Sequence, residues 1–148
     1  MIFYDYKDFP RVGRIIGLDW GGRRCGVALA DLEHDFVFSR PSINVKNQSE
    51  LVDAVLNLIA EESAVGIVLG LPLRGDGTDS ETTICVREFA DMLSKKTELP
   101  ILFVEENLTS SAAQDELRTS NISKIKQKLD SISARIILEN AIAMIKRN

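Results

Sequence analysis

Carboxylates are the side chains in this sequence whose type and spacing best support chemistry. Asp19 ends a predicted strand, Glu106 follows a later one, and Asp130 lies in the first turn of the last predicted helix. Three clustered carboxylates repel one another and raise each other's pKa values unless a cation neutralises them. Mg²⁺ prefers oxygen ligands and is often completed by substrate phosphates. Two such ions about 4 Å apart can drive phosphodiester hydrolysis without histidine or cysteine.

Each of these acids also has an ordinary structural interpretation. Asp19 could be a turn former, because a glycine pair follows it closely. Glu106 follows Glu105, and one member of that pair could be a solvated neighbour. Asp130 could be favoured by helix capping and by the helix dipole. Spacing alone therefore leaves the role of each acid open.

Histidine and cysteine chemistry finds little support in the sequence. His34 is the single histidine, it follows a turn-like segment, and no nucleophile-elbow motif accompanies it. The two cysteines, Cys25 and Cys85, lie far apart in different predicted elements. We expect both to be small buried apolar residues rather than a zinc site or a disulfide.

The charge distribution bears on nucleic-acid binding. The net charge of -4 argues against a dedicated nucleic-acid coat protein. The chain from residue 118 onward is nevertheless rich in basic residues, and it could present a local positive face or a merely solvated helix surface. These basic residues are Arg118, Lys124, Lys126, Lys128, Arg135, Lys146 and Arg147. Lys126 is the substrate-contact candidate taken from this stretch.

Length and composition fit one globular domain. The chain has 148 residues, 45% of them hydrophobic, which suffices for a core. It contains no apolar run of the roughly 18 residues that a membrane span needs, and its start does not read as a secretion signal. We therefore predict a cytoplasmic protein with an aromatic N-terminal arm at 1–13 and one domain at 14–148.

The hydrophobic pattern predicts an α/β architecture with an antiparallel edge on a mixed sheet. Gly21-Gly22 supplies a turn, Pro41 is expected to limit the third strand, and Ser49 is expected to cap the first helix. The predicted strands are 14–19, 24–30, 35–38, 65–69 and 100–104, and the predicted helices are 48–62, 80–96, a segment through Ala112, Ala113 and Leu117, and 129–146. A polar linker is predicted at 119–128. The carboxyl ends of neighbouring strands should gather the acids at one edge.

Four sequence blocks resemble those of the YqgF/RuvX family, relatives of the RuvC Holliday-junction resolvases. The blocks are 17–28 (GLDWGGRRCGVA), 70–78 (GLPL, then DGT), 105–110 (EENLTS) and Asp130 followed by Ser133-Ala134. They occur in family order and span the chain from about Arg14 to Ile145. One block would be a weak signal, whereas four in order are specific.

The resemblance implies a ribonuclease-H-like fold, with a mixed five-stranded sheet and flanking helices, and a metal-dependent nuclease, a hydrolase linked to trimming the 5′ end of precursor 16S ribosomal RNA. Asp19, Glu106 and Asp130 would be catalytic and would bind Mg²⁺ or Mn²⁺. The remaining matched positions are substrate-binding candidates, the arginines for phosphate contacts and the glycines for close backbone approach. These positions are Arg23, Arg24, Arg87, Gly70 and Gly77.

Some positions depart from the family pattern. The third block usually reads Asp-Glu-Arg, whereas this chain has Glu105, Glu106 and Asn107, so it lacks an arginine that could bind phosphate or carboxylate bidentately. Arg74 stands where the family often has asparagine, and Ser133 replaces a small apolar residue. All three acids are retained.

Two other functions remain open at this level. A resolvase acting on branched DNA would need a dimer with two active sites, and the aromatic arm at 1–13 could serve as a homodimer interface. A non-catalytic nucleic-acid-binding or ribosome-assembly module could use the same fold in association with the ribosome. A pure binding face, however, gains nothing from clustered negative charge near phosphates.

Overall fold

The computed structural model describes residues 2–3, 5–105 and 122–147; for residues 2–3 and 122–131 it describes the backbone only. The elements in chain order are β1 (Ile2–Phe3), the short 3-10 helix η1 (Tyr6–Asp8), β2 (Ile15–Gly21), β3 (Arg24–Ala30), β4 (Val37–Asn44), α1 (Gln48–Glu62), β5 (Gly66–Leu71), α2 (Glu81–Ser94), β6 (Ile101–Glu105) and α4 (Ile122–Arg147).

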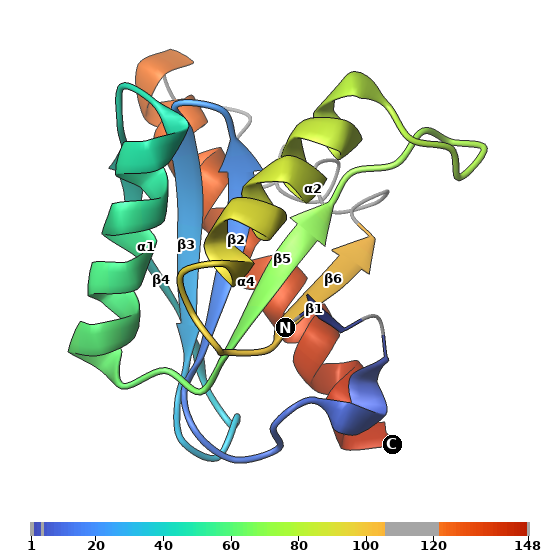
Figure 1. Cartoon of the computed structure of the whole chain (residues 1–148). Helices are drawn as coiled ribbons and strands as arrows, with labels where there is room; N and C mark the ends of the chain where they lie inside the picture. The colour runs from blue at the N-terminus through green and yellow to red at the C-terminus, as the bar shows by residue number, and fades with distance from the viewer. Residues whose placement is uncertain (1, 4, 106–121, 148) are drawn as a thin grey trace.

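One mixed six-stranded sheet, in the order β1-β6-β5-β2-β3-β4, organises the molecule (Figure 1). β1, β6, β5 and β2 are parallel, whereas β2, β3 and β4 form an antiparallel meander. The parallel strands therefore bring their carboxyl ends, at Gly21, Leu71 and Glu105, to the same side of the sheet. We call this side the carboxyl edge.

Strand alternation divides the sheet into two faces, each with its own core. Ile16 and Leu18 of β2 pack in the cluster that contains the apolar residues of α1 and α2. Ile15 packs in the other cluster, with Ala134 and Leu138 of α4. Odd-numbered residues of β2 thus face α4, and even-numbered residues face α1 and α2.

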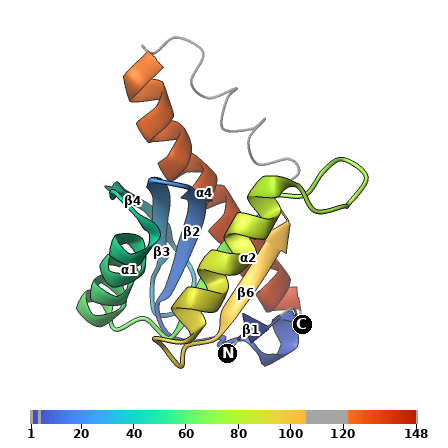
Figure 2. The same ribbon diagram turned by 45° about the horizontal axis from the view of Figure 1, so that its top comes forward.

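α4 crosses its face of the sheet in close contact with β2. A Cβ atom added to Gly17 would lie 2.8 Å from Leu138 Cβ and 3.2 Å from the Ala134 carbonyl oxygen, so a larger residue would push the helix away. The turned view shows α4 running diagonally, with its first turns projecting beyond the carboxyl edge (Figure 2). No helix in the described part of the chain is both long and apolar enough to cross a membrane.

The predicted fold class is confirmed, and the five predicted strands are all present. The sixth, β1, comes from the N-terminal arm, where two residues pair with β6. The arm also packs on the body, since Phe9 is 3% exposed and its ring fills the space over Gly66. A two-residue strand has no measurable periodicity, so the five-strand prediction missed it.

Two local predictions around β4 and α1 were wrong. β4 continues through Pro41 to Asn44 because it is an edge strand and a register shift opposite Gly26 accommodates the proline. The N-cap of α1 is Asn47 rather than Ser49, with the Asn47 side chain accepting a hydrogen bond from the backbone of Glu50 at 2.9 Å. Asparagine is at least as good a cap as serine, and the two lie within one turn of each other.

The last helix begins seven residues earlier than predicted. α4 starts at Ile122, so most of the polar stretch interpreted as a linker is helical. Residue 130 consequently lies well inside the helix rather than in its first turn. The helix predicted through Ala112, Ala113 and Leu117 lies outside the described residues.

Candidate active site

Asp19 lies inside β2, on the α4 face, two residues before the carboxyl edge. The strand was predicted to end at this residue, but β2 continues to Gly21, and Asp19 pairs with Gly26 of β3. The turn of the hairpin falls at Gly22, whose φ is +80°, and at Arg23. The interpretation of Asp19 as a turn former is therefore wrong.

Glycines border Asp19 on both neighbouring strands. Gly26 is its partner on β3, and Gly70 follows the Leu18–Leu69 pair on β5, which puts Gly70 beside Asp19. Neither glycine projects a side chain toward α4. Asp19 is partly exposed, and the positions beside it on both neighbouring strands carry no side chain.

The backbone of α4 brings residue 130 to the same level as Asp19. Ala134 lies over Gly17. From Gly17 to Asp19, β2 runs about 6.6 Å toward the carboxyl edge. From Ala134 back to residue 130, α4 runs about 6 Å toward the same edge. Residue 130 is eight positions beyond Ile122, so helix capping and the helix dipole do not explain an aspartate there.

Three predicted site groups lie outside what the structure describes. These are Glu106 and the side chains of Asp130 and Lys126. Among the described residues there is no group of three His, Cys, Asp or Glu side chains that could hold a metal ion. The predicted donor set is made only of carboxylates, which suits a hard divalent cation.

Glu105 ends β6 at this edge, and its negative charge acts on Tyr6 of the N-terminal arm. The side chain of Tyr6 is partly buried, and this burial, assisted by the negative charge of Glu105, raises the pKa of the Tyr6 hydroxyl. A cavity of about 500 Å³ lies between the arm, β6 and α4, with Tyr6, Glu105 and Asn140 in its lining. The arm is therefore close to the carboxyl end of β6.

The structure separates the two neighbouring arginines of the first block. Ala28 and Ala30 of β3 pack against α4, so alternation puts Arg24 on the face of Asp19. Arg23, in the hairpin turn, instead lines a pocket on the other face, together with Trp20. Adjacent positions in the sequence thus serve opposite faces of the sheet.

Arg87 is held at the carboxyl edge by Asp79. Its Nε donates to Asp79 Oδ2 at 3.2 Å, and its guanidinium carbon lies 5.8 Å from the centroid of the Phe103 ring. The pair is half-exposed, so a phosphate could compete with Asp79 for the same guanidinium. Arg87 is therefore oriented in advance on a surface that substrate could reach.

The loop after β5 is shaped by a turn at 74–77. Gly77 has φ +83° and donates its N–H to the Arg74 carbonyl at 2.8 Å, so a left-handed residue is required there. Asp76 accepts from the hydroxyl and the backbone of Thr78, and these hydrogen bonds lower the pKa of the Asp76 carboxyl. These hydrogen bonds close the loop on itself between Arg74 and Thr78.

Sequence reasoning did not single out Trp20 or Lys46. Both line a cavity of about 390 Å³, which we call the Trp20 pocket, at the carboxyl edge on the α1–α2 face. Trp20 is the single tryptophan of the chain and directly follows Asp19. Its position next to a candidate catalytic acid could have indicated a functional role from the sequence. The pocket lining includes Trp20, Arg23, Lys46, Gln48, Cys85 and Glu88.

Solved structures with this fold define the class of protein. RuvC of Thermus thermophilus aligns with a TM-score of 0.57 at 8% identity, covering 90% of this chain and 96% of RuvC. A yeast mitochondrial Holliday junction resolvase aligns with a TM-score of 0.56 at 16% identity, covering 94% of this chain and 82% of the other. The chain thus has the ribonuclease-H-like fold of the RuvC type.

Sequence comparison then identifies the family. The model of the RuvX family, described as Holliday junction resolvase, matches residues 13–144, and the chain belongs to that family. A relative from Maridesulfovibrio salexigens is 38% identical over 132 residues, covering 88% of this chain and 98% of the relative. Another from Rickettsia canadensis is 31% identical and covers 99% of each chain. Both are described as candidate pre-16S rRNA nucleases.

Proposed function

We propose that this protein is a metal-dependent nuclease that hydrolyses phosphodiester bonds at the carboxyl edge, in maturation of the 5′ end of precursor 16S ribosomal RNA. The observation that carries the proposal is the position of Asp19. It faces α4, has Gly26 and Gly70 beside it on the neighbouring strands, and lies level with residue 130 of α4. The description shared by the two relatives named above supports the choice of RNA.

In this proposal the acids hold the metal. Asp19, Glu106 and Asp130 would bind Mg²⁺ or Mn²⁺, and when bound the metal would supply an activated water and charge stabilisation at the leaving oxygen. Leu102 and Val104 of β6 face α4, the same side of the sheet as Asp19.

The basic residues would position the strand. Arg24 would contact a phosphate on the Asp19 face, and Arg87 would exchange Asp79 for a phosphate at the end of β6. Gly70 would let the substrate backbone approach the sheet closely, and Gly77 would hold the loop turn beside it. Lys126 would add a phosphate contact from α4.

The wider setting follows from this function. Residues 14–148 would act as one domain, which the extent of the family match supports, with 1–13 as an arm docked on it. The protein would work in the cytoplasm and associate with precursor ribosomal particles. A homodimer is required only if the substrate is a branched DNA.

Resolution of a DNA junction is the second candidate, favoured by the description of the family model. The deciding experiment incubates the purified protein with a 5′-extended 16S precursor fragment and with a four-way DNA junction. Each substrate is tested with Mg²⁺, with Mn²⁺ and with chelator, and Asp19→Asn serves as the control for contaminating nuclease.

Metal-dependent cutting of the RNA that is lost in Asp19→Asn supports the proposal. Cutting of the junction alone replaces it with a resolvase. Binding without cutting, equal in both proteins, removes the catalytic function and leaves a nucleic-acid-binding or ribosome-assembly module.

A further inference from the structure

The Trp20 pocket is built by segments far apart in the chain. The hairpin contributes Trp20 and Arg23, the start of α1 and the loop before it contribute Gln48 and Lys46, and α2 contributes Glu88. Its volume of about 390 Å³ is within the range of small-ligand sites, roughly 300–1,000 Å³. The pocket can therefore hold a group the size of a nucleotide.

The Trp20 ring is fixed in place before any ligand arrives. Its Nε1 donates to Gln48 Oε1 at 2.7 Å, while Gln48 Nε2 donates to the Gly22 carbonyl at 2.9 Å. Both polar groups of Gln48 are thus engaged within the protein. An indole held in this way offers a preorganised apolar surface, which lowers the entropy lost when a ligand binds.

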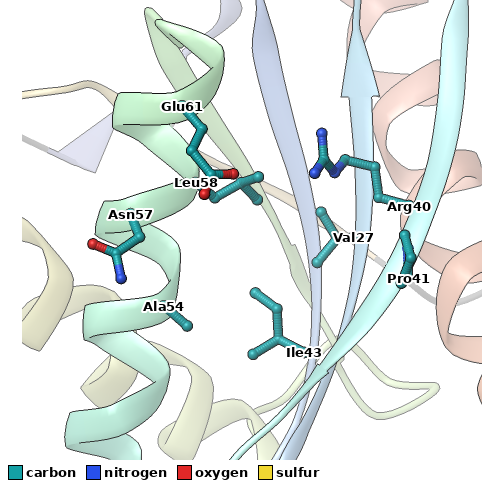
Figure 3. A pocket seen from close by; sticks show the side chains of 8 residues that line it. All are labelled: Val27, Arg40, Pro41, Ile43, Ala54, Asn57, Leu58 and Glu61. Atoms are coloured by element: carbon teal, nitrogen blue, oxygen red, sulfur yellow. The ribbon is translucent and has the colours of Figure 1, made fainter.

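Two cations of this pocket lie at the solvent surface. Arg23 and Lys46 are exposed, and within the described part of the chain neither side-chain cation has a carboxylate or carbonyl partner. Arg40 lines the pocket between α1 and β4 (Figure 3). Unlike Arg23 and Lys46, it donates to a carboxylate of the protein, that of Glu62. The charges of the Trp20 pocket are therefore available to an anion from outside.

An aromatic platform beside two cations is the arrangement that binds single-stranded nucleic acid. Bases stack on aromatic rings whatever their sequence, and Lys or Arg neutralise the backbone phosphates. A base in a duplex could not enter, because both of its faces are already stacked. Glu88 adds a hydrogen-bond acceptor of the kind that pairs with the amino group of a base.

The pocket lies close to the proposed cleavage site. Trp20 follows Asp19 directly in β2 and points to the opposite face of the strand, and both residues lie within three positions of the hairpin turn at Gly22. A Cβ atom added to Gly22 would have no neighbour within 4 Å among the described residues, so none of their side chains crowds the turn. A strand crossing this turn would reach both sites.

We propose that the Trp20 pocket is a binding subsite for one unpaired nucleotide of the substrate strand, next to the bond that is cut. Its base stacks on Trp20, and its phosphates contact Arg23 and Lys46. This inference rests on the proposed nuclease function for its position relative to cutting, but not for the binding itself.

Trp20 also provides the test, because its fluorescence is the only tryptophan signal of the chain. A ten-nucleotide single-stranded RNA is titrated into the protein in chelator, with the same RNA as a duplex for comparison. We expect saturable quenching by the single strand and at least tenfold weaker binding of the duplex. Cys85 lines the pocket, whereas Cys25 is fully buried, so alkylation of Cys85 should slow when the RNA is bound.

Variants separate this subsite from general electrostatics. Arg23→Gln with Lys46→Gln should weaken RNA binding about tenfold, while the control Arg11→Gln with Lys95→Gln removes the same charge elsewhere and should change it less than twofold. Trp20→Leu, followed by anisotropy of a labelled RNA, should weaken binding roughly tenfold. Since Trp20 packs on the core, the exposed pair Arg23 and Lys46 keeps the test valid if that variant fails to fold.

Equal loss of affinity in both charge-removal variants, or equal binding of single strand and duplex, would overturn the subsite. Failure of the proposed function has a different signature. RNA quenching of Trp20 in a protein that cuts neither substrate would retain the nucleotide site and remove the nuclease, whereas cutting without quenching would do the reverse.

Discussion

Two hollows of similar size, both formed by described residues on the same face of the sheet, use arginine differently. The Trp20 pocket, of about 390 Å³, lies at the carboxyl edge and presents Arg23 to solvent. The pocket between α1 and β4, of about 330 Å³, is lined by Arg40 (Figure 3). Arg40 forms an ion pair with Glu62. We call the second one the Arg40 pocket. Arg40 therefore has an internal carboxylate partner, whereas Arg23 has none within the described part of the chain.

The Arg40 pocket belongs to the framework of the fold. Glu62, at the end of α1, accepts from Arg40 on β4 and from Arg14 ahead of β2, the latter at 3.1 Å. This cluster ties the helix to the antiparallel side of the sheet. The carboxyl edge has no comparable cluster around Arg23 within the described part of the chain. Changes at the two hollows should therefore affect different properties.

The largest expected difference concerns carboxylates. Asp19→Asn should reduce metal-dependent cleavage on the order of 10³-fold, because a neutral amide is a poor metal ligand and several kcal/mol of stabilisation would be lost. Glu61→Gln, in the Arg40 pocket, should leave the rate within twofold. Single-turnover cleavage of the precursor RNA measures both. Equal losses of cleavage in the two variants would mean that the carboxyl edge and the Arg40 pocket do not differ in function.

The second prediction tests how α4 is positioned against β2. Gly17→Ala would bring a methyl group within 2.8 Å of Leu138 Cβ, and such overpacking should cost about 1–3 kcal/mol of the free energy of unfolding. Gly75→Ala, in the open loop, meets no described atom within 4 Å and should change stability little. Urea denaturation compares them. If Gly17→Ala proves neutral, α4 does not rest on Gly17 as described.

The third prediction compares the two arginines directly. Arg40→Gln should lower the free energy of unfolding by about 1 kcal/mol, because Glu62 then keeps only Arg14 as a partner. Arg23→Gln should leave stability unchanged and weaken RNA binding instead. Thermal denaturation and RNA titration on the same two proteins provide the measurement. Reversed outcomes would mean that Arg23 is the structural residue.

The smallest effect concerns a carboxylate at the opposite edge of the sheet. Backbone N–H groups, first that of Phe36 and then that of Asp35, lower the pKa of Asp31. A lowered pKa in the folded state contributes stability above the unfolded value of about 3.9, and that contribution is lost as the pH falls through the folded value. Asp31→Asn should therefore reduce the acid dependence of unfolding below about pH 4. The effect is small because the turn is exposed.

A matched variant at the carboxyl edge sharpens that measurement. Hydrogen bonds to Thr78 lower the pKa of Asp76, so Asp76→Asn should also reduce the acid dependence of the free energy of unfolding. Since this loop follows β5 at the carboxyl edge, where cleavage is proposed, Asp76→Asn should also lower RNA cleavage at neutral pH, whereas Asp31→Asn should not. An effect of Asp31→Asn on cleavage would contradict the separation of the two edges.

Elements with strong local signals could be predicted from the sequence with the right bounds. The apolar stripe of α1 and the compact run of β3 gave Gln48–Glu62 and Arg24–Ala30, as observed. Prediction failed where distant partners decide. β4 passes through Pro41 because a bulge opposite Gly26 absorbs the proline, and β1 exists because β6 offers an open edge. Neither partner is visible in a local window.

The sequence by itself determined the order of elements, the family and the candidate acids, because hydrophobic period, turn residues and motif spacing are properties of the chain. Tertiary structure alone decided which face each residue occupies. Asp19 and Trp20 are neighbours in the chain, yet one faces α4 and the other the Trp20 pocket. Side chains alternate along a strand, so neighbours face opposite sides of the sheet. Only the packing of helices on the two faces decides the surroundings of each side chain.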